Sequence, residues 1–230
     1  MSRLVRLVAL TNNPNPAQAA IIAYSSQAAS AATSMTVLSH PTGTQTTSLI
    51  ILSANSDDNQ AAPTSVTNYT NIAISGNRDE LAVFRKTDFS GSVSGNLPVF
   101  YDNSSTDAVS AAAMAFTGVF DISAGVTVDD VEYSGAAFST SAMSCSVDKS
   151  IHVIICSIRR ERDSNTPSFM QTPTGYTRWF DLLPSTQDQP VQNVFYKLVD
   201  AGSVGGVSLT PNSTNDEGCV VSFCVNGGTN

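Results

Sequence analysis

Two stretches of the chain carry the same series of motifs in the same order, and this repetition constrains the fold more than any other feature. The first series occupies 48–54, 68–70, 81–88 and 112–118, and the second occupies 151–157, 175–177, 194–200 and 218–225. Matched residues lie 102 positions apart at the first motif (Leu49 and Ile151) and 111 apart at the third (Lys86 and Lys197). Four matches in one order predict an internal duplication, with pseudo-repeats over about 36–120 and 135–226.

Each half has the pattern of several short β-strands. Residues 151–158 are apolar on both faces and rich in β-branched side chains, which predicts a central strand that is covered on both sides. Shorter runs at 81–86 and 194–199 predict further strands, and pairs of Gly, Asn and Ser mark turns between them. Because amphipathic helical stretches are missing from the gaps, we expect an all-β fold. The specific expectation is a single jelly-roll-like β-sandwich over 17–230, made of two pseudo-repeated halves.

The segment 17–35 is rich in alanine and fits either a short helix or an edge strand. We favour a strand at 20–24, because the Ser-Ser and Thr-Ser pairs that follow are poor residues for a helix interior.

Residues 1–16 form a separate element in the sequence. The prolines of the run 13–16 disrupt regular structure, so we expect an extended N-terminal arm outside the sandwich. A terminus is ordered only when something ties it down, either the chain's own sandwich or a neighbouring subunit. The predicted partner contacts in this arm are Arg3, Arg6, Asn13 and Pro14.

The chain is poor in charge and acidic overall. Charged residues make up 13%, about half the usual share, and the net charge is −8. An acidic chain repels nucleic-acid backbones and anionic membranes, so we expect neither as a partner. No apolar run approaches the roughly 20 residues of a membrane-spanning helix. Arg6 interrupts the apolar stretch near the N-terminus, which argues against a signal peptide and for synthesis in a cytoplasm.

The four cysteines have no CxxC spacing and lie among apolar or small residues. We expect buried free thiols in preference to disulfides. The residues concerned are Cys145, Cys156, Cys219 and Cys224.

The sequence gives only weak indications of a metal, catalytic or ligand site. Residues 55–59 gather side-chain oxygens that could hold calcium, but a solvated turn fits better because the EF-hand pattern is absent. His152 lies inside a predicted strand, where a hydrogen-bonded imidazole is a better interpretation than a metal ligand. Trp179 and Phe180 are expected in the core, whereas an exposed pair would suggest sugar stacking. No catalytic, cofactor-binding or metal-binding residue is predicted, and we expect a protein that is not an enzyme.

The densest charge cluster is 159–163, which follows the predicted central strand. We expect it in a loop at one end of the sandwich. A solvated loop and a contact with an acidic neighbouring subunit are both open, since arginine pairs well with carboxylates. The predicted contact residues are Arg159, Arg160 and Arg162.

The motif order resembles a family of bacteriophage and prophage proteins. Its members have a Pro-x-Gly-(Trp/Tyr)-Thr turn, a Tyr-Tyr-(Lys/Arg) strand and an Ala-rich strand that ends near Gly-Val. The matching motifs are 173–177 and 195–197 in the second half, and 68–70, 84–86 and 116–119 in the first. The resemblance covers about residues 36–226, although the first half lacks the Pro-x-Gly.

The resemblance implies a jelly-roll-like virion protein, assembled in the host cytoplasm. It would be a capsid decoration or cement protein that contacts the major capsid protein or other virion subunits, as a homo-oligomer or in many copies. The alternative is a tail or fibre component that binds a host receptor or a surface glycan.

Overall fold

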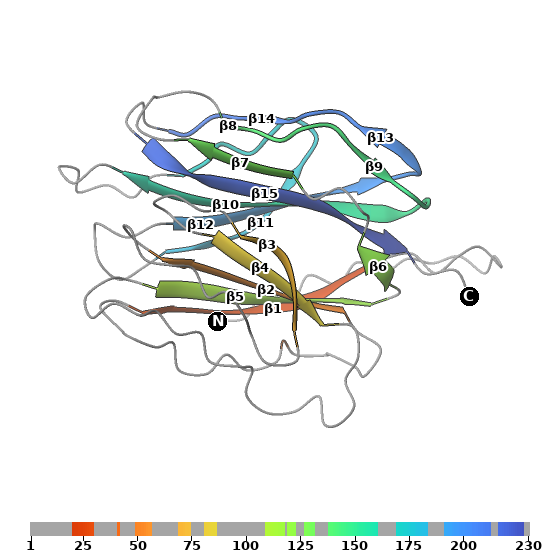
Figure 1. The fold of residues 1–230 in the computed structure, drawn as a ribbon, viewed down its shortest axis with the longest axis horizontal. Coiled ribbons are helices and arrows are strands. Elements are labelled where there is room, and N and C mark those ends of the chain that lie inside the picture. Colours follow the sequence, from red (N-terminus) through yellow and green to blue (C-terminus); the bar gives the residue numbers. More distant parts are fainter. Residues whose placement is uncertain are drawn as a thin grey trace.

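The computed structural model describes residues 20–29, 41, 49–56, 69–74, 81–86, 109–117, 119–122, 127–131, 138–160, 169–183, 191–212 and 216–227. Over these ranges the chain folds into β-strands that pair antiparallel throughout (Figure 1). The expected all-β class is therefore confirmed. A helix long and apolar enough to cross a membrane does not occur in these ranges. The N-terminal arm at 1–16 lies outside the described residues.

The first half of the chain forms a five-stranded sheet with the order β1-β5-β2-β4-β3. Its strands are β1 (Ala20–Ala29), β2 (Leu49–Ser56), β3 (Thr70–Ile74), β4 (Leu81–Lys86) and β5 (Val109–Thr117). The Ala-rich segment is thus an edge strand, as expected, and it pairs with the equally Ala-rich β5.

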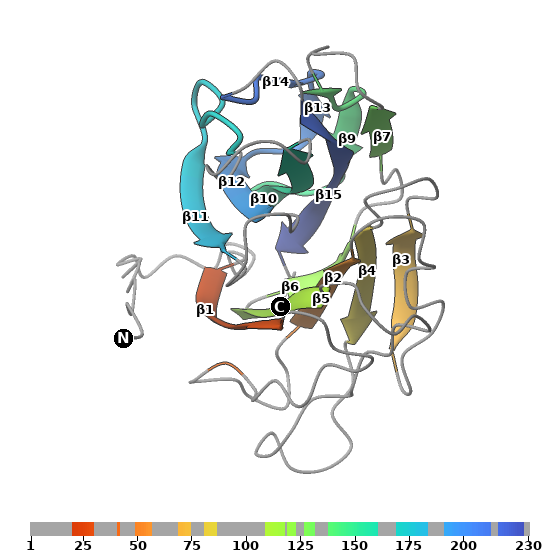
Figure 2. The ribbon, with the colours of Figure 1, turned by 90° about the vertical axis from the view of Figure 1, so that its left-hand side faces the viewer.

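The second half forms a six-stranded sheet with the order β11-β12-β10-β15-β6, in which β7 also pairs with β15. Its strands are β6 (Val119–Ile122), β7 (Thr127–Val131), β10 (Ser150–Arg160), β11 (Thr177–Leu182), β12 (Val191–Val199) and β15 (Asp216–Gly227). Figure 2 shows the two sheets as separate layers packed face to face.

Four short strands lie over the outer face of the second sheet, as Figure 1 shows. They form two small ladders, β13 with β9 and β14 with β8. Their bounds are β8 (Phe138–Ser139), β9 (Met143–Cys145), β13 (Gly202–Val204) and β14 (Ser208–Leu209). We call these four strands, with the stretch 205–207, the outer layer.

The main core lies between the two sheets and contains side chains from both. Leu49 and Phe116 come from the first sheet, whereas Val153 and Phe223 come from the second. Trp179 packs its ring against that of Phe116, with the centroids 5.5 Å apart. Phe180 is 5% exposed, so the prediction of a core position is confirmed for it, and Trp179 is partly buried against the same core.

A buried polar contact joins the two sheets through this core. Ser53 donates a hydrogen bond of 2.7 Å to the side chain of Gln192, and Asn55 donates one of 3.0 Å to Ser157. All four side chains are at most 1% exposed. The expectation of a solvated turn at 55–59 was therefore wrong for Asn55, which lies on β2 because its pairing with Leu81 of β4 continues the ladder. Residues 57–59 lie outside the described ranges.

Strand β10 is buried on both faces, as its sequence predicted. Ile151, Val153 and Ile155 enter the core between the sheets. Ile154 and Cys156 alternate with them and enter a second core under the outer layer. This layer explains why the strand needs apolar side chains on both sides.

The expectation of free thiols was wrong for two of the four cysteines. Cys145 of β9 and Cys224 of β15 form a disulfide, which ties the outer layer to the second sheet. Cys156 and Cys219 are buried and form no disulfide, as predicted. The pair is 79 residues apart in sequence, so only the packing of β9 over β15 brings the two sulfur atoms together.

Candidate functional site

The residues predicted to contact a partner are only partly described. Arg3, Arg6, Asn13, Pro14 and Arg162 lie outside the described ranges. The prediction of a loop was wrong for Arg159 and Arg160, which are the last residues of β10. The strand continues through them because β15 runs alongside, with Glu217 opposite Arg159 and Asp216 opposite Arg160.

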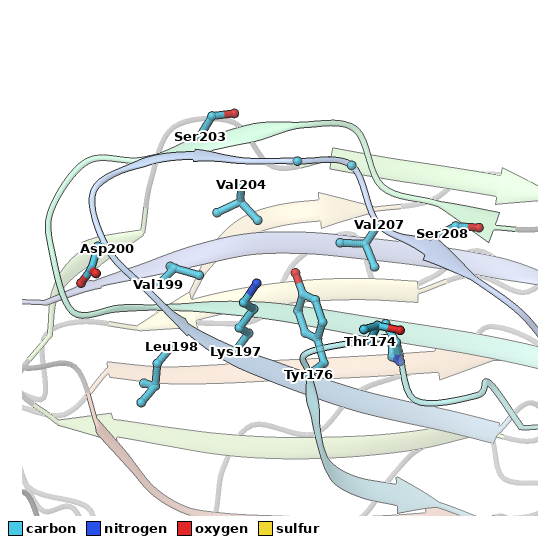
Figure 3. Close-up of a pocket in the computed structure, with 13 residues that line it drawn as sticks. Thr174, Tyr176, Lys197, Leu198, Val199, Asp200, Ser203, Val204, Val207 and Ser208 are labelled. Atoms are coloured by element: carbon cyan, nitrogen blue, oxygen red, sulfur yellow. The ribbon is translucent and has the colours of Figure 1, made fainter.

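A pocket of about 640 Å³ lies between the second sheet and the outer layer (Figure 3). Its wall on one side is the stretch 203–208, and its floor is the C-terminal end of β12. Figure 3 shows Lys197 and Tyr176 side by side and pointing toward this stretch, whereas Leu198 points away. The polar residues that line the pocket are Thr174, Tyr176, Lys197, Asp200, Ser203 and Ser208, and Figure 3 shows the Ser203 side chain pointing away from it.

A tight turn places Tyr176 at the floor of this pocket. The Tyr176 amide donates a hydrogen bond of 3.0 Å to the carbonyl of Pro173. Gly175, at the third position of the turn, has φ of 81°, a value that favours glycine and is typical of a type II turn. The Pro-x-Gly-Tyr motif therefore sets the direction in which the Tyr176 ring leaves the backbone.

His152 contacts the hydroxyl end of the Tyr176 ring and is almost completely buried, with 1% exposure. Its Nδ1 atom and the Tyr176 hydroxyl are 2.6 Å apart, which confirms a hydrogen-bonded imidazole. Its Nε2 atom has no partner within the described part of the chain. Burial, and secondly the charge of Lys197, lower the pKa of His152 to about 4. Burial raises the pKa of Tyr176 to about 12, so both groups are neutral at pH 7.

Lys197, His152 and Cys224 form a row across three adjacent strands. His152 faces Lys197 of β12 on one side and Cys224 of β15 on the other. The Lys197 ammonium lies 5.7 Å from the centre of the Tyr176 ring, within the range of a cation–π contact. The buried imidazole thus separates the pocket from the disulfide.

The wall at 203–208 is anchored on both sides of the pocket. Val204 pairs with Met143 in the ladder that carries the disulfide. At the other end of this wall, the Val207 amide donates to the Thr140 hydroxyl at 3.1 Å, and the Thr140 amide donates to the Val207 carbonyl at 2.9 Å. These anchors fix the wall before any ligand arrives.

The segment before the Pro173 turn is held by Arg178. Its guanidinium forms an ion pair of 2.7 Å with Asp181 and donates to the Thr172 hydroxyl and to the carbonyl of Met170. Asn193 then donates to Asp181 at 2.6 Å and accepts from the Met170 amide at 3.0 Å. This network positions the opposite wall of the pocket.

The lowered pKa of His152 predicts a loss of stability in mild acid. The folded state binds the proton less tightly than the unfolded state, so stability is full above the ordinary pKa of 6.5 and falls as the pH drops from there toward 4. The expected loss is about 3 kcal/mol. Urea unfolding of the wild type and of His152→Gln between pH 7 and pH 4 measures it. The variant should lose correspondingly less, and equal losses in both proteins would contradict the assignment.

The sequence indicated parts of this site but not the pocket itself. The Pro-x-Gly-Tyr-Thr and Phe-Tyr-Lys motifs supply Tyr176 and Lys197. The remaining wall comes from Ser203–Ser208, whose Gly-rich sequence indicates only a turn. Comparisons of the chain with protein-family models, with curated proteins and with solved structures gave no match.

Proposed function

We propose that the chain is a non-enzymatic structural protein of a bacteriophage particle, a decoration or cement protein on the capsid surface. The observation that carries the proposal is a charge-poor chain, 13% charged, folded into a sandwich whose two sheets share one core. A surface with few charges loses little solvation when it packs against neighbouring subunits. Its partners would be the major capsid protein or other virion subunits, with many copies on each particle.

We also propose that the two halves are an internal duplication, a feature that suits a compact module used in many copies. The strand orders support it. The first sheet reads β3-β4-β2-β5-β1 and the second reads β11-β12-β10-β15-β7. When the five strands of each half are ranked along the chain, both orders are third, fourth, second, fifth, first. This correspondence extends the proposed repeat to β1 and β7. The jelly-roll description of the sandwich stays a prediction.

The registers support the duplication residue by residue. The pair Ile50–Lys86 between β2 and β4 corresponds to the pair His152–Lys197 between β10 and β12. The ladder of β3 and β4 shifts between Asn71 and Ala73, and that of β11 and β12 shifts between Arg178 and Phe180. These shifts fall at the same place after the Tyr-Thr motif in each half.

A cation–π contact recurs in both halves. The Lys86 ammonium lies 5.9 Å from the centre of the Tyr69 ring, and Lys197 stands in the same relation to Tyr176. Burial raises the pKa of Tyr69, as it does that of Tyr176. This pair is therefore part of the common architecture that we propose for the halves.

The disulfide fits a particle that leaves the cell. Disulfides are rare in reducing cytoplasm and persist in oxidising surroundings. A virion protein assembled in the host cytoplasm would carry Cys145 and Cys224 as thiols and would oxidise them after release. The bond would then hold the outer layer in place on the exposed particle.

Co-sedimentation with capsids tests the proposal. The purified chain, and a version that lacks residues 1–16, are mixed with capsids of a phage whose genome encodes the chain. We expect saturable binding of the full chain and at least about tenfold weaker binding of the truncated chain, because we assign subunit contacts to Arg3, Arg6, Asn13 and Pro14. Unchanged occupancy after truncation would contradict the role of the arm.

A tail or fibre component that binds a host receptor or carbohydrate is the second candidate. The pocket beside Tyr176 and Lys197 favours it, since small-molecule sites are concave and have a few convergent polar groups. Retention of the chain on host cells, without binding to capsids, would support this candidate over the first.

A further inference from the structure

The pocket under the outer layer has the size and the fixed shape of a ligand site. Its volume of about 640 Å³ falls within the usual range of about 300–1,000 Å³ for small-molecule sites. The walls are held by the disulfide, by the Thr140–Val207 hydrogen bonds and by the Arg178 network. A site whose shape is already fixed loses little conformational entropy when it binds a ligand.

We propose that this pocket binds a neutral saccharide unit of one or two rings. The lining offers hydroxyl groups from Thr174 and Ser208, each of which can donate and accept a hydrogen bond, and backbone amides and carbonyls from the stretch 203–208. Sugar hydroxyls need this mixture of donors and acceptors.

The charges at the pocket balance. Lys197 supplies one ammonium and Asp200 one carboxylate, and both side chains are exposed at the pocket. Within the described residues neither has an ion-pair partner, so both can take part in hydrogen bonds with a ligand. The carboxylate accepts from neighbouring hydroxyls and the ammonium donates to ring or hydroxyl oxygens. One charge of each sign favours a ligand without net charge.

The apolar part of the lining suits the C–H faces of a sugar ring. Val204 and Val207 project from the wall toward the side of the pocket where Tyr176 stands, as Figure 3 shows. A partly buried tyrosine gives a rigid apolar surface at small conformational cost.

The second half differs from the first at this place. The Tyr–Lys pair occurs in both halves, so it stabilises the fold and does not by itself mark a ligand site. Ile50 takes the register position of His152 in the first half. The test therefore alters the wall of the pocket and leaves Tyr176 and Lys197 unchanged.

Gly205 is the best position for a blocking substitution. A Cβ atom at Gly205 would have no heavy atom within 4 Å, so a phenylalanine there adds bulk to a residue that lines the pocket without displacing the backbone. Ser144 of β9 is the matched control, because it is exposed in the same outer layer and does not line the pocket. Equal melting temperatures of Gly205→Phe, Ser144→Phe and the wild type would show that the fold is kept.

Saturation-transfer NMR with glucose, galactose, mannose, N-acetylglucosamine and lactose measures the binding, with glucuronate as the charged comparison. We expect saturable binding of at least one neutral sugar with Kd of about 1 mM or lower. Gly205→Phe and Asp200→Ala should weaken it at least about tenfold, and Ser144→Phe should leave it unchanged.

Three results would overturn the proposal: no saturable binding of a neutral sugar, binding of glucuronate alone, or undiminished binding by Gly205→Phe. The capsid proposal is independent of this outcome, because co-sedimentation with capsids is measured separately. A chain that binds sugar but not capsids refutes the decoration role and leaves the pocket assignment standing.

Discussion

The Ile154→Asp variant should be unfolded at 25 °C. Ile154 has no exposed surface and packs under the outer layer with Phe138, Phe195 and Leu209. The substitution removes a buried side chain, at a cost of about 2–5 kcal/mol, and buries a carboxylate without a partner, at a cost of several kcal/mol more. A domain is stable by only about 5–15 kcal/mol, so the two costs together remove most or all of the stability. Circular dichroism and thermal melting measure the outcome.

Leu198→Asp is the matched control on the neighbouring strand. Leu198 is 43% exposed, so its substitution should change the free energy of unfolding by about 0.5 kcal/mol or less. A cooperative melt of Ile154→Asp near the wild-type temperature would mean that β10 is not covered on both faces.

Gly218→Ala should lower the free energy of unfolding by about 3 kcal/mol or more. A Cβ atom at Gly218 would lie 2.0 Å from the carbonyl oxygen of Ser157 and 2.8 Å from Cα of Ile158. Gly218 also has φ of 153°, which side-chain-bearing residues rarely adopt. Because the obstructing atoms belong to the backbone of β10, relief requires the ladder between β10 and β15 to open. Urea unfolding measures the change.

Gly205→Ala is the control for this substitution. The added methyl group meets open space, so stability should stay the same or rise by up to about 1 kcal/mol. Similar stabilities of Gly218→Ala and Gly205→Ala would show that β15 does not approach β10 as closely as described.

The sequence predicted best those strands whose apolar residues show on which faces the strand is buried. Apolar residues on both faces of 151–158 indicate burial on both sides, and β10 has that burial. The run 81–86 coincides with β4, and the strand at 20–24 lies within β1. In each case the pattern of apolar residues within the strand is enough to predict it.

The disulfide and the outer layer could not be predicted because they depend on contacts between distant segments. The spacing of Cys145 and Cys224 carries no motif, and the bond exists because β9 lies over β15. Strands of two or three residues, such as Ser208–Leu209, are too short to show alternation of apolar and polar side chains.

The pocket could be predicted only in part from the sequence. The turn at Pro173–Tyr176 follows from Pro and Gly, and it directs Tyr176 toward the floor. The buried imidazole of His152 was predicted as a hydrogen-bonded side chain, but its partner Tyr176 was not predicted. The opposite wall is defined by the packing of 203–208 against Thr140, which the local sequence does not encode.

Cryo-electron microscopy of particles tests the central claim most directly. Particles of a phage that lacks this gene are incubated with the purified chain and imaged after unbound protein is removed. The account predicts two-sheet density at symmetry-related positions over the capsid, in many copies. Density confined to the tail or its fibres, or capsids that remain bare while the chain stays in solution, would contradict it.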